Sequence, residues 1–289
     1  MNGNRTLGYS MLAPALIVIG VFILYPIVGA FVTSFFADTP FAPRRFVGLG
    51  NFARLTGDDP AIGSVGFTLL FVAVSTTLEI LLGLLMALVM HHTWRGRGWI
   101  RAAVLIPWAI PTVVTAVMWK FMFNDQYGFF NLLWHGNAIE YYTAWLADPG
   151  SARLAIIMAD VWKTSSFAAL IILAGLQTIP RELYDAARVD GAGAFRRFRA
   201  ITLPLLRPAI VLALLFRVID AFRVFDLVYV MTQGAPGNST SVLQFYGYQK
   251  MFPEQQFGYG SAISVVVFLM IAVFGWIAVR MLSTRMHES

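Results

Sequence analysis

The sequence predicts an all-α integral membrane protein with six transmembrane helices, and three observations predict it. The 289 residues are 58% hydrophobic and only 12% charged, whereas an average soluble domain is about 45–50% apolar and about a quarter charged. The apolar residues gather in six runs, each long enough to supply the roughly 20 residues that cross a bilayer. Open sheet cannot cross lipid because its backbone groups would lack partners, so each run is expected to be helical.

The six predicted spans follow one another along a single transmembrane domain, residues 1–289. They cover residues 11–36, 62–90, 99–123, 153–179, 204–232 and 258–281. The first span exceeds the roughly 7–15 apolar residues of a signal peptide, so it is predicted to be a retained helix. In the third span Pro107 and Pro111 predict a kink, with a gating role as the alternative.

Basic residues predict that both termini lie in the cytoplasm, because short cytoplasmic loops collect Lys and Arg. With the N-terminus inside, the inner basic residues are Arg5, Arg95, Arg97, Arg101, Arg181, Arg188, Arg196, Arg197, Arg199, Arg207, Arg280 and Arg285. The outer ones are Arg44, Arg45, Arg54, Arg153 and Lys250, with Lys120 near the boundary. The outer loop after the first span also carries the balancing Asp38, Asp58 and Asp59.

Several function classes are excluded. The chain has no cysteine, which rules out disulfides, zinc–thiolate sites and cysteine nucleophiles, and its four scattered histidines argue against a metal centre. The net charge of +6 is spread over short clusters between apolar runs, without the continuous basic stripe of a nucleic-acid binder. No G-x-x-x-x-G-K-[ST] loop and no catalytic triad occurs, so the chain is not expected to be an enzyme or to hydrolyse ATP itself.

The predicted cytoplasmic loop 181–208 is too apolar to be a solvated connector. On a helix, its apolar residues would form a stripe ringed by arginines, and such a patch usually marks a docking surface. The stripe consists of Leu183, Ala186, Ala187, Val189, Phe195, Phe198, Ile201 and Leu203. Gly191 permits the turn that ends the first short helix, and Pro204 fits the first turn of the next span. A helix lying on the membrane surface is the alternative.

This loop resembles a known family. Asp185-Ala186-Ala187, then Gly191 and Ile201-x-Leu203-Pro204, resembles the EAA loop of ABC importer permeases. With Asp190, Ala192 and Pro208 added, it is similar to the carbohydrate branch that includes maltose and glycerol-phosphate permeases. The segments Trp145-Leu-Ala-Asp-Pro149, Thr232-Gln-Gly-Ala-Pro236 and Gly258-Tyr-Gly-Ser-Ala262 also resemble that family, so the resemblance covers most of the chain. Asp185 stands where the family usually has Glu, which keeps the charge but shortens the reach.

The resemblance implies the type I permease fold of ABC importers, in the cytoplasmic (inner) membrane of a bacterium or archaeon. It implies a second homologous permease, two ATP-binding subunits and an extracytoplasmic sugar-binding protein as partners. ATP and Mg would bind to the partner subunits, and this chain would hold no cofactor. Loop 181–203 would be the coupling helix that sits in a cleft of the ATPase. Its coupling residues would be Glu182, Asp185, Ala186, Ala187, Asp190, Gly191, Ala192, Leu203 and Pro204.

Charged residues inside the fourth and fifth predicted spans mark a candidate substrate pathway. A charge near the bilayer centre costs about 2.5–3.5 kcal/mol, so these side chains should face partner helices or water. In the fifth span the charges recur every three residues with alternating sign, within side-chain reach of one another. Carboxylates, ammonium groups and aromatic rings together suit a sugar. The predicted pathway residues are Asp160, Trp162, Lys163, Arg217, Asp220, Arg223, Asp226 and Tyr229, with Phe222 and Phe225 as further rings. Purely structural pairing between helices is the alternative.

The segments ADVWKTSSF (159–167) and LLFRVIDAFRVFDLVYVMT (214–232) resemble permeases of trehalose importers, which implies a disaccharide such as trehalose or maltose. One competing hypothesis is an ion-coupled secondary transporter of a polar solute that uses Glu79, Asp220 and Asp226. Glu79 is, however, expected to pair inside the bundle, and the two halves show no evident repeat. A third hypothesis is that the chain is a receptor or scaffold membrane protein that transports nothing.

Overall fold

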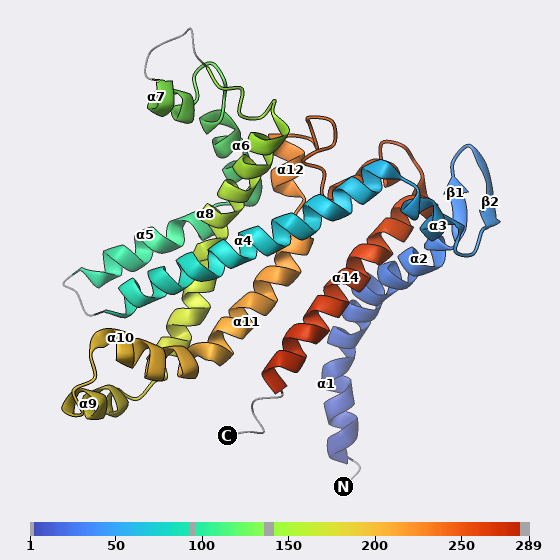
Figure 1. Cartoon of the computed structure of the whole chain (residues 1–289). Helices are drawn as coiled ribbons and strands as arrows, with labels where there is room; N and C mark the ends of the chain where they lie inside the picture. Colours follow the sequence, from blue (N-terminus) through green and yellow to red (C-terminus); the bar gives the residue numbers. More distant parts are fainter. Residues whose placement is uncertain (1–2, 93–95, 136–141, 284–289) are drawn as a thin grey trace. The chain divides into compact units, whose positions relative to one another are not determined.

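The computed structural model describes residues 3–92, 96–135 and 142–283, and most of them are helical (Figure 1). The chain divides into two compact units. Unit 1 comprises Met1–Ile62 and Tyr246–Leu269, and unit 2 comprises Gly63–Phe245 and Met270–Ser289. A single functional domain over residues 1–289 stays a prediction. Of the arginines assigned to the cytoplasmic side, Arg95 and Arg285 lie outside the described residues, as do the side chains of Arg5 and Arg97.

The six-helix membrane fold is confirmed. Among the described residues, five helices are long and apolar enough to cross a bilayer, and a bent helix pair makes a sixth if it counts as one span. The five are Met11–Ser34, Asp59–His91, Pro149–Gln177, Ala194–Phe222 and Phe257–Ile277, and the bent pair is Gly98–Ala109 with Thr112–Met122. The side of the membrane on which each terminus lies stays a prediction.

Unit 1 begins with the first span and a small hairpin that the sequence analysis did not predict. Its elements are α1 (Gly3–Ile19), a π-helical turn (Gly20–Leu24), α2 (Tyr25–Ser34), β1 (Phe36–Thr39), β2 (Ala42–Phe46), α3 (Gly50–Thr56), most of α13 (Leu243–Met251) and the start of α14 (Phe257–Ser283). The strands pair antiparallel, with Phe36 opposite Phe46. The amide of Asn51 donates to the carbonyls of Ser34 (2.8 Å) and Phe36 (2.9 Å), so α3 fixes the helix-to-strand junction.

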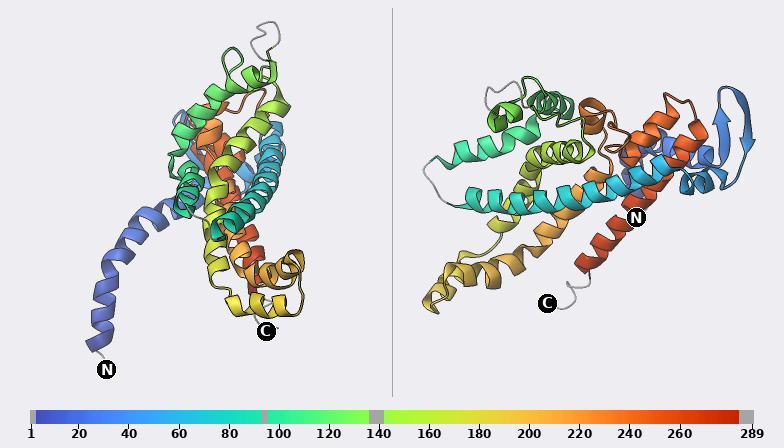
Figure 2. Two further views of the ribbon diagram at one scale, coloured as in Figure 1. Left: turned by 90° about the vertical axis from the view of Figure 1, so that its left-hand side faces the viewer. Right: turned by 45° about the horizontal axis from the view of Figure 1, so that its top comes forward.

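Unit 2 is built around α8 (Pro149–Gln177), whose residues are mostly buried. Its other elements are most of α4 (Asp59–His91), α5 (Arg97–Ala109), α6 (Thr112–Met122), α7 (Phe129–His135), α9 (Arg181–Val189), α10 (Ala194–Arg197), α11 (Leu203–Phe222), α12 (Asp226–Met231) and the end of α14. Helix α8 packs against α5, α6, α11 and α12, as the views in Figure 2 also show. The core around Ile172 and Leu206 joins α8 to α11 and α4.

Glycines let these helices approach closely. A Cβ added at Gly83 of α4 would lie only 2.8 Å from the Cβ of Ala168 in α8, and one at Gly175 of α8 would meet Ala209 of α11. Small residues at such crossings allow backbones to pack tightly in membrane proteins.

Two π-helical turns precede prolines at the same offset. The turns are Gly20–Leu24, before Pro26, and Phe198–Thr202, before Pro204. In a regular helix the proline ring would clash with the carbonyl four residues earlier, and a wider turn relieves that clash. The helix therefore runs through Pro204 from Ala194 to Phe222. The fifth span predicted at 204–232 is thus wrong at both ends, because residues 223–225 interrupt the helix before α12.

The predicted kink in the third span is a complete break. Helices α5 and α6 meet at an angle of 93°. Ile110 is extended (φ −74°, ψ 132°) and precedes Pro111, which disfavours helical geometry in the residue before it. Pro107, by contrast, lies inside α5. The break therefore belongs to Pro111.

Candidate functional site

The elbow, residues 181–203, projects from unit 2 as α9, a glycine turn and α10. Gly191 has φ +75°. The N–H of Ala192 donates to the carbonyl of Ala187 (2.8 Å), and that of Gly191 donates to the carbonyl of Arg188 (3.0 Å). This pair of bonds is the Schellman motif, which needs a left-handed residue at the Gly191 position. The predicted turn at Gly191 is confirmed.

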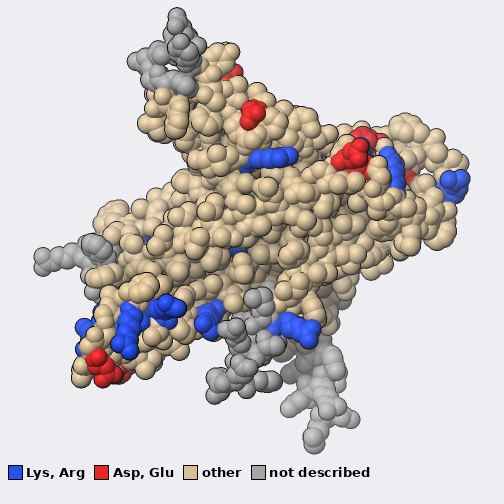
Figure 3. All heavy atoms as spheres, viewed as in Figure 1, with Lys and Arg blue, Asp and Glu red and all other residues tan. Residues whose placement is uncertain are grey.

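The elbow exposes apolar side chains among basic ones. Val189 is 89% exposed, Phe195 76% and Leu183 43%, and no residue of α9 is buried. Figure 3 shows basic side chains gathered over the short helices α9 and α10. Among the predicted coupling residues, the exposed ones are Glu182, Asp185, Ala186, Asp190 and Gly191, and the half-buried ones are Ala187, Ala192, Leu203 and Pro204. The described part of the elbow thus offers an apolar surface with a basic rim.

The base of the elbow is held firmly. The hydroxyls of Tyr184 and Thr202 share a hydrogen bond (2.9 Å), and Arg197 donates to the carbonyl of Ala192 (2.7 Å). Tyr184 and Ile201 pack against the core shared by α4, α8 and α11. Asp185 forms an ion pair with Arg188 of its own helix. A force on α9 would therefore reach the helices of unit 2.

A cavity of about 300 Å³ lies in unit 2, where two helices are broken. Trp108 and Thr112 flank the break between α5 and α6, and residues 223–225 form the break between α11 and α12. Five of the predicted pathway residues line this cavity, namely Asp160, Lys163, Asp220, Arg223 and Asp226. Broken helices at membrane depth are tolerated where they line a cavity, and they often build binding sites there.

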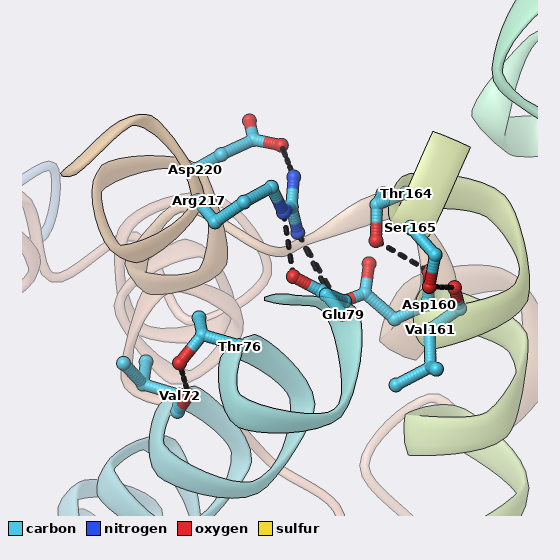
Figure 4. Close-up of polar contacts among 9 residues, drawn as sticks. All are labelled: Val72, Thr76, Glu79, Asp160, Val161, Thr164, Ser165, Arg217 and Asp220. Atoms are coloured by element: carbon cyan, nitrogen blue, oxygen red, sulfur yellow. Dashed lines mark hydrogen bonds and ion pairs between the residues drawn. The ribbon is translucent and has the colours of Figure 1, made fainter. Parts of the chain in front are cut away.

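Beside the cavity, Arg217 ties three helices together (Figure 4). Its guanidinium is 2% exposed. It donates from Nε to Glu79 Oε2 (2.6 Å), from Nη2 to Glu79 Oε1 (3.2 Å) and from Nη1 to Asp220 Oδ2 (2.6 Å). Asp160 Oδ2 lies 3.5 Å from Nη2. Helices α4, α8 and α11 thus share one ion cluster, and the expected pairing of Glu79 inside the bundle is confirmed.

Other predicted pathway residues lie elsewhere. Arg217 does not line the cavity. Trp162 packs on Trp119, with ring centroids 5.8 Å apart, and Tyr229 stacks on Phe225 at 5.4 Å. Phe225 does line the cavity, whereas Phe222 is buried against Phe274.

The charge ladder predicted for span five forms only in part. Arg217 pairs with Asp220, but the helix ends at Phe222, so Arg223 lies in the break and Asp226 begins α12 after it. In the part of the chain that the structure describes, neither has an ion-pair partner within 4.0 Å. Both side chains are exposed and line the cavity.

Trp108, Thr112 and Thr164 line the cavity and were missed from sequence. Trp108 and Thr112 lie close to Pro111, one of the two residues that predicted a kink in the third span. A kink that left the helix continuous would not have turned both side chains toward one cavity, so the prediction of a kink did not include them. Trp108 is backed by Phe167 at a ring distance of 5.6 Å. Supported aromatic rings beside carboxylates and basic groups suit a polyhydroxylated ligand, which needs apolar contact and hydrogen bonds together.

Comparison with known proteins gives a consistent picture. Residues 79–288 match the family described as "Binding-protein-dependent transport system inner membrane component". The trehalose/maltose transport system permease protein MalF of Thermococcus litoralis is 45% identical over 269 residues, 93% of this chain and 90% of that protein. The sulfoquinovosyl glycerol transport system permease protein SmoG of Agrobacterium fabrum is 40% identical over 98% of this chain and 92% of that protein.

The fold also matches a solved structure. A bacterial ABC transporter involved in the import of the acidic polysaccharide alginate superposes with a TM-score of 0.84 at 23% identity, over 96% of each chain. At this identity the likeness concerns the fold alone. It agrees with the predicted importer permease architecture.

Proposed function

Because this chain belongs to the family of binding-protein-dependent transport system inner membrane components, we propose that it forms half of the translocation pathway for a disaccharide such as trehalose or maltose. The cavity of unit 2 carries this proposal. Its three carboxylates and two basic side chains can accept from and donate to sugar hydroxyls, while Trp108 and Phe225 offer apolar ring faces.

The relatives support a sugar and leave its identity open. The Thermococcus litoralis protein is named for trehalose and maltose, and the Agrobacterium fabrum protein for a different glycoside. An uncharged disaccharide fits the cavity better than an anionic one, because its lining holds more carboxylates than basic groups. Trehalose and maltose are therefore the first substrates to test.

The chain is a multi-pass transport subunit of the inner membrane and not an enzyme. Energy would come from two separate ATP-binding subunits that hold ATP and Mg²⁺. The elbow would dock on them through the exposed side chains of Leu183, Val189 and Phe195. A second permease would complete the pathway, and an extracytoplasmic sugar-binding protein would deliver the sugar. The elbow and both termini would then lie in the cytoplasm, in keeping with the arginines around it.

The alternative of an ion-coupled transporter has less support. It would use Glu79, Asp220 and Asp226 as ion carriers. Two of these, Glu79 and Asp220, are already paired with Arg217, and family membership favours ATP as the energy source.

Uptake of radiolabelled trehalose and maltose into proteoliposomes tests the proposal. The complete importer should accumulate sugar when ATP is present inside the vesicles. Omitting the ATPase subunits should abolish uptake, and so should a non-hydrolysable nucleotide. Uptake that persists without the ATPase and follows a proton or sodium gradient would contradict the proposal.

A further inference from the structure

Lys163 connects the cavity to the broken helix beside it. It belongs to α8 and lines the cavity. Its ammonium donates a hydrogen bond of 2.9 Å to the carbonyl of Ile110, the residue that ends α5. One side chain therefore touches both the space proposed for the sugar and the hinge between α5 and α6.

The Ile110 carbonyl needs this partner because the helix stops there. In a continuous helix it would accept from the N–H four residues later. The extended Ile110 removes that donor, and α6 starts anew with the N–H of Thr115 bonded to the carbonyl of Pro111. An unpaired carbonyl at membrane depth is costly, and a cation at a helix C-terminus is favourable. The ammonium of Lys163 thus stabilises the 93° bend.

The same ammonium can also bind a ligand. It carries three N–H donors, and the structure assigns one of them to Ile110. Trp108 and Thr112, one on each side of the break, line the cavity together with Lys163. A sugar hydroxyl that accepts from Lys163 would compete with the Ile110 carbonyl for the position of the ammonium, weaken that bond and so make the bend less stable.

We infer that Lys163 is a positioning residue that couples sugar occupancy of the cavity to the angle between α5 and α6. The inference rests on the proposed function, since it takes the cavity ligand to be a sugar. A ligand shifts a conformational equilibrium only through different contacts in the two states, and the contact with Lys163 is such a difference.

A second lysine gives a matched control. Lys120 of α6 donates to the carbonyl of Val230 in α12 (3.1 Å), so it too satisfies the backbone of a neighbouring helix. Lys120 does not line the cavity. Its removal takes away a similar bond without a contact to the sugar.

The bend can be measured directly because the chain has no native cysteine. Spin labels on Trp99→Cys and Val117→Cys would report it, since these side chains are 85% and 55% exposed. At 1.5 Å per residue the two Cα atoms should lie about 19 Å apart in the bent form and about 27 Å apart in a straight helix. The complete importer in nanodiscs is measured by double electron–electron resonance, with and without saturating trehalose.

Trehalose should shift the distance distribution of the doubly labelled importer toward the longer limit, by part of the roughly 8 Å that separates the bent and straight forms. Lys163→Met should lose the shift, while Lys163→Arg, which keeps a cationic donor, and Lys120→Met should retain it. If the importer with Lys163→Met does not assemble, Lys163→Gln replaces it, because a shorter uncharged side chain cannot bond both the Ile110 carbonyl and the sugar.

An equal shift in the Met or Gln variant, or no shift with Lys163 present, overturns the inference. Failure of ATP-driven trehalose uptake in the same preparation would instead count against the proposed function.

Discussion

Arg217 is the residue on which the packing of three helices in unit 2 depends. Its guanidinium is almost fully buried and bonded to Glu79 and Asp220. Removing one member of a buried ion pair costs about 3–5 kcal/mol, because the other charge stays buried without its partner. The pairing of Arg217 with Asp220 could be predicted from their three-residue spacing. Its pairing with Glu79 of α4 could not, because Glu79 lies 138 positions away in the sequence.

Arg217→Met should therefore destabilise the protein by about 3–5 kcal/mol, visible as a large drop in the thermal unfolding temperature in detergent. Arg223→Gln is the matched control, since Arg223 is exposed and has no ion-pair partner among the described residues. It should change stability by less than about 0.5 kcal/mol and lower only sugar uptake. Equal unfolding temperatures for the two variants would show that the cluster does not hold the helices.

The environment of Asp58 predicts that the stability of unit 1 depends on pH. Burial raises the pKa of its carboxyl, but the hydrogen bonds that it accepts from Tyr259, Tyr246 and the N–H of Ala61 outweigh burial and leave the pKa below its usual value. A depressed folded-state pKa means that Asp58 stabilises the fold above the unfolded pKa of about 3.9 and loses this effect as the pH falls through the folded value.

The difference in unfolding temperature between the native chain and Asp58→Asn should be largest near pH 7 and should become smaller below about pH 4. Thermal unfolding across pH 3–8 measures it, with Asp59→Asn as the control, because Asp59 is exposed. A difference that is constant with pH would contradict the assignment.

Among the elements, the elbow is the one whose local geometry was most predictable. Its apolar residues, Gly191 and following proline are local signals, and the Schellman turn forms where they place it. The hairpin β1–β2 and the break at residues 223–225 could not be predicted, because apolar residues continue on both sides of the break and hydropathy does not report helix ends. The cavity depends on two such breaks meeting in space, so Pro111 could mark a bend near Trp108 but could not show that Trp108 lines a cavity.

Val189→Asp should weaken binding of the ATPase subunits to the elbow by about 10- to 100-fold, because burying such a side chain contributes about 1.5–3 kcal/mol. The amount of protein in the membrane should not change, since Val189 is 89% exposed. Phe41→Asp, at an 84% exposed position in the loop between β1 and β2, is the control. Affinity of the purified permease for the ATPase is the measurement, and an affinity unchanged by Val189→Asp would refute docking at this surface.

Gly191→Pro should uncouple ATP hydrolysis from uptake while leaving membrane insertion intact. Proline fixes φ near −65° and cannot adopt the φ of +75° found at this position, so the turn that orients α9 would be lost. Parallel assays of ATPase rate and uptake in proteoliposomes test this. Normal uptake per ATP would mean that the orientation of α9 does not matter for coupling.

The crossing of α4 and α8 can be tested by overpacking. Gly83→Ala should destabilise unit 2 by about 1–3 kcal/mol, because the new methyl group would sit 2.8 Å from Ala168. Gly66→Ala in the same helix has nothing within 4 Å and should be neutral or stabilising by up to about 1 kcal/mol. Thermal unfolding distinguishes them, and equal behaviour of the two variants would argue against the close approach.

At the scale of the whole molecule, hydropathy predicted the membrane class because lipid demands long apolar helices regardless of sequence detail. Predicting the function required two further features, namely a site that binds a solute and a surface that docks on an ATPase subunit. Unit 2 holds candidates for both, since the cavity and the base of the elbow share helices α8 and α11. In the proposed function, this shared framework would transmit the effect of ATP hydrolysis in the partner subunits from the elbow to the cavity.

A structure of the assembled importer with trehalose bound tests this account most directly. The sugar should lie in the cavity of unit 2, in contact with Lys163 and Asp226, and α9 should be seated in the ATPase subunit. Sugar bound away from these residues, together with an elbow that lies against lipid or its own helices, would contradict it.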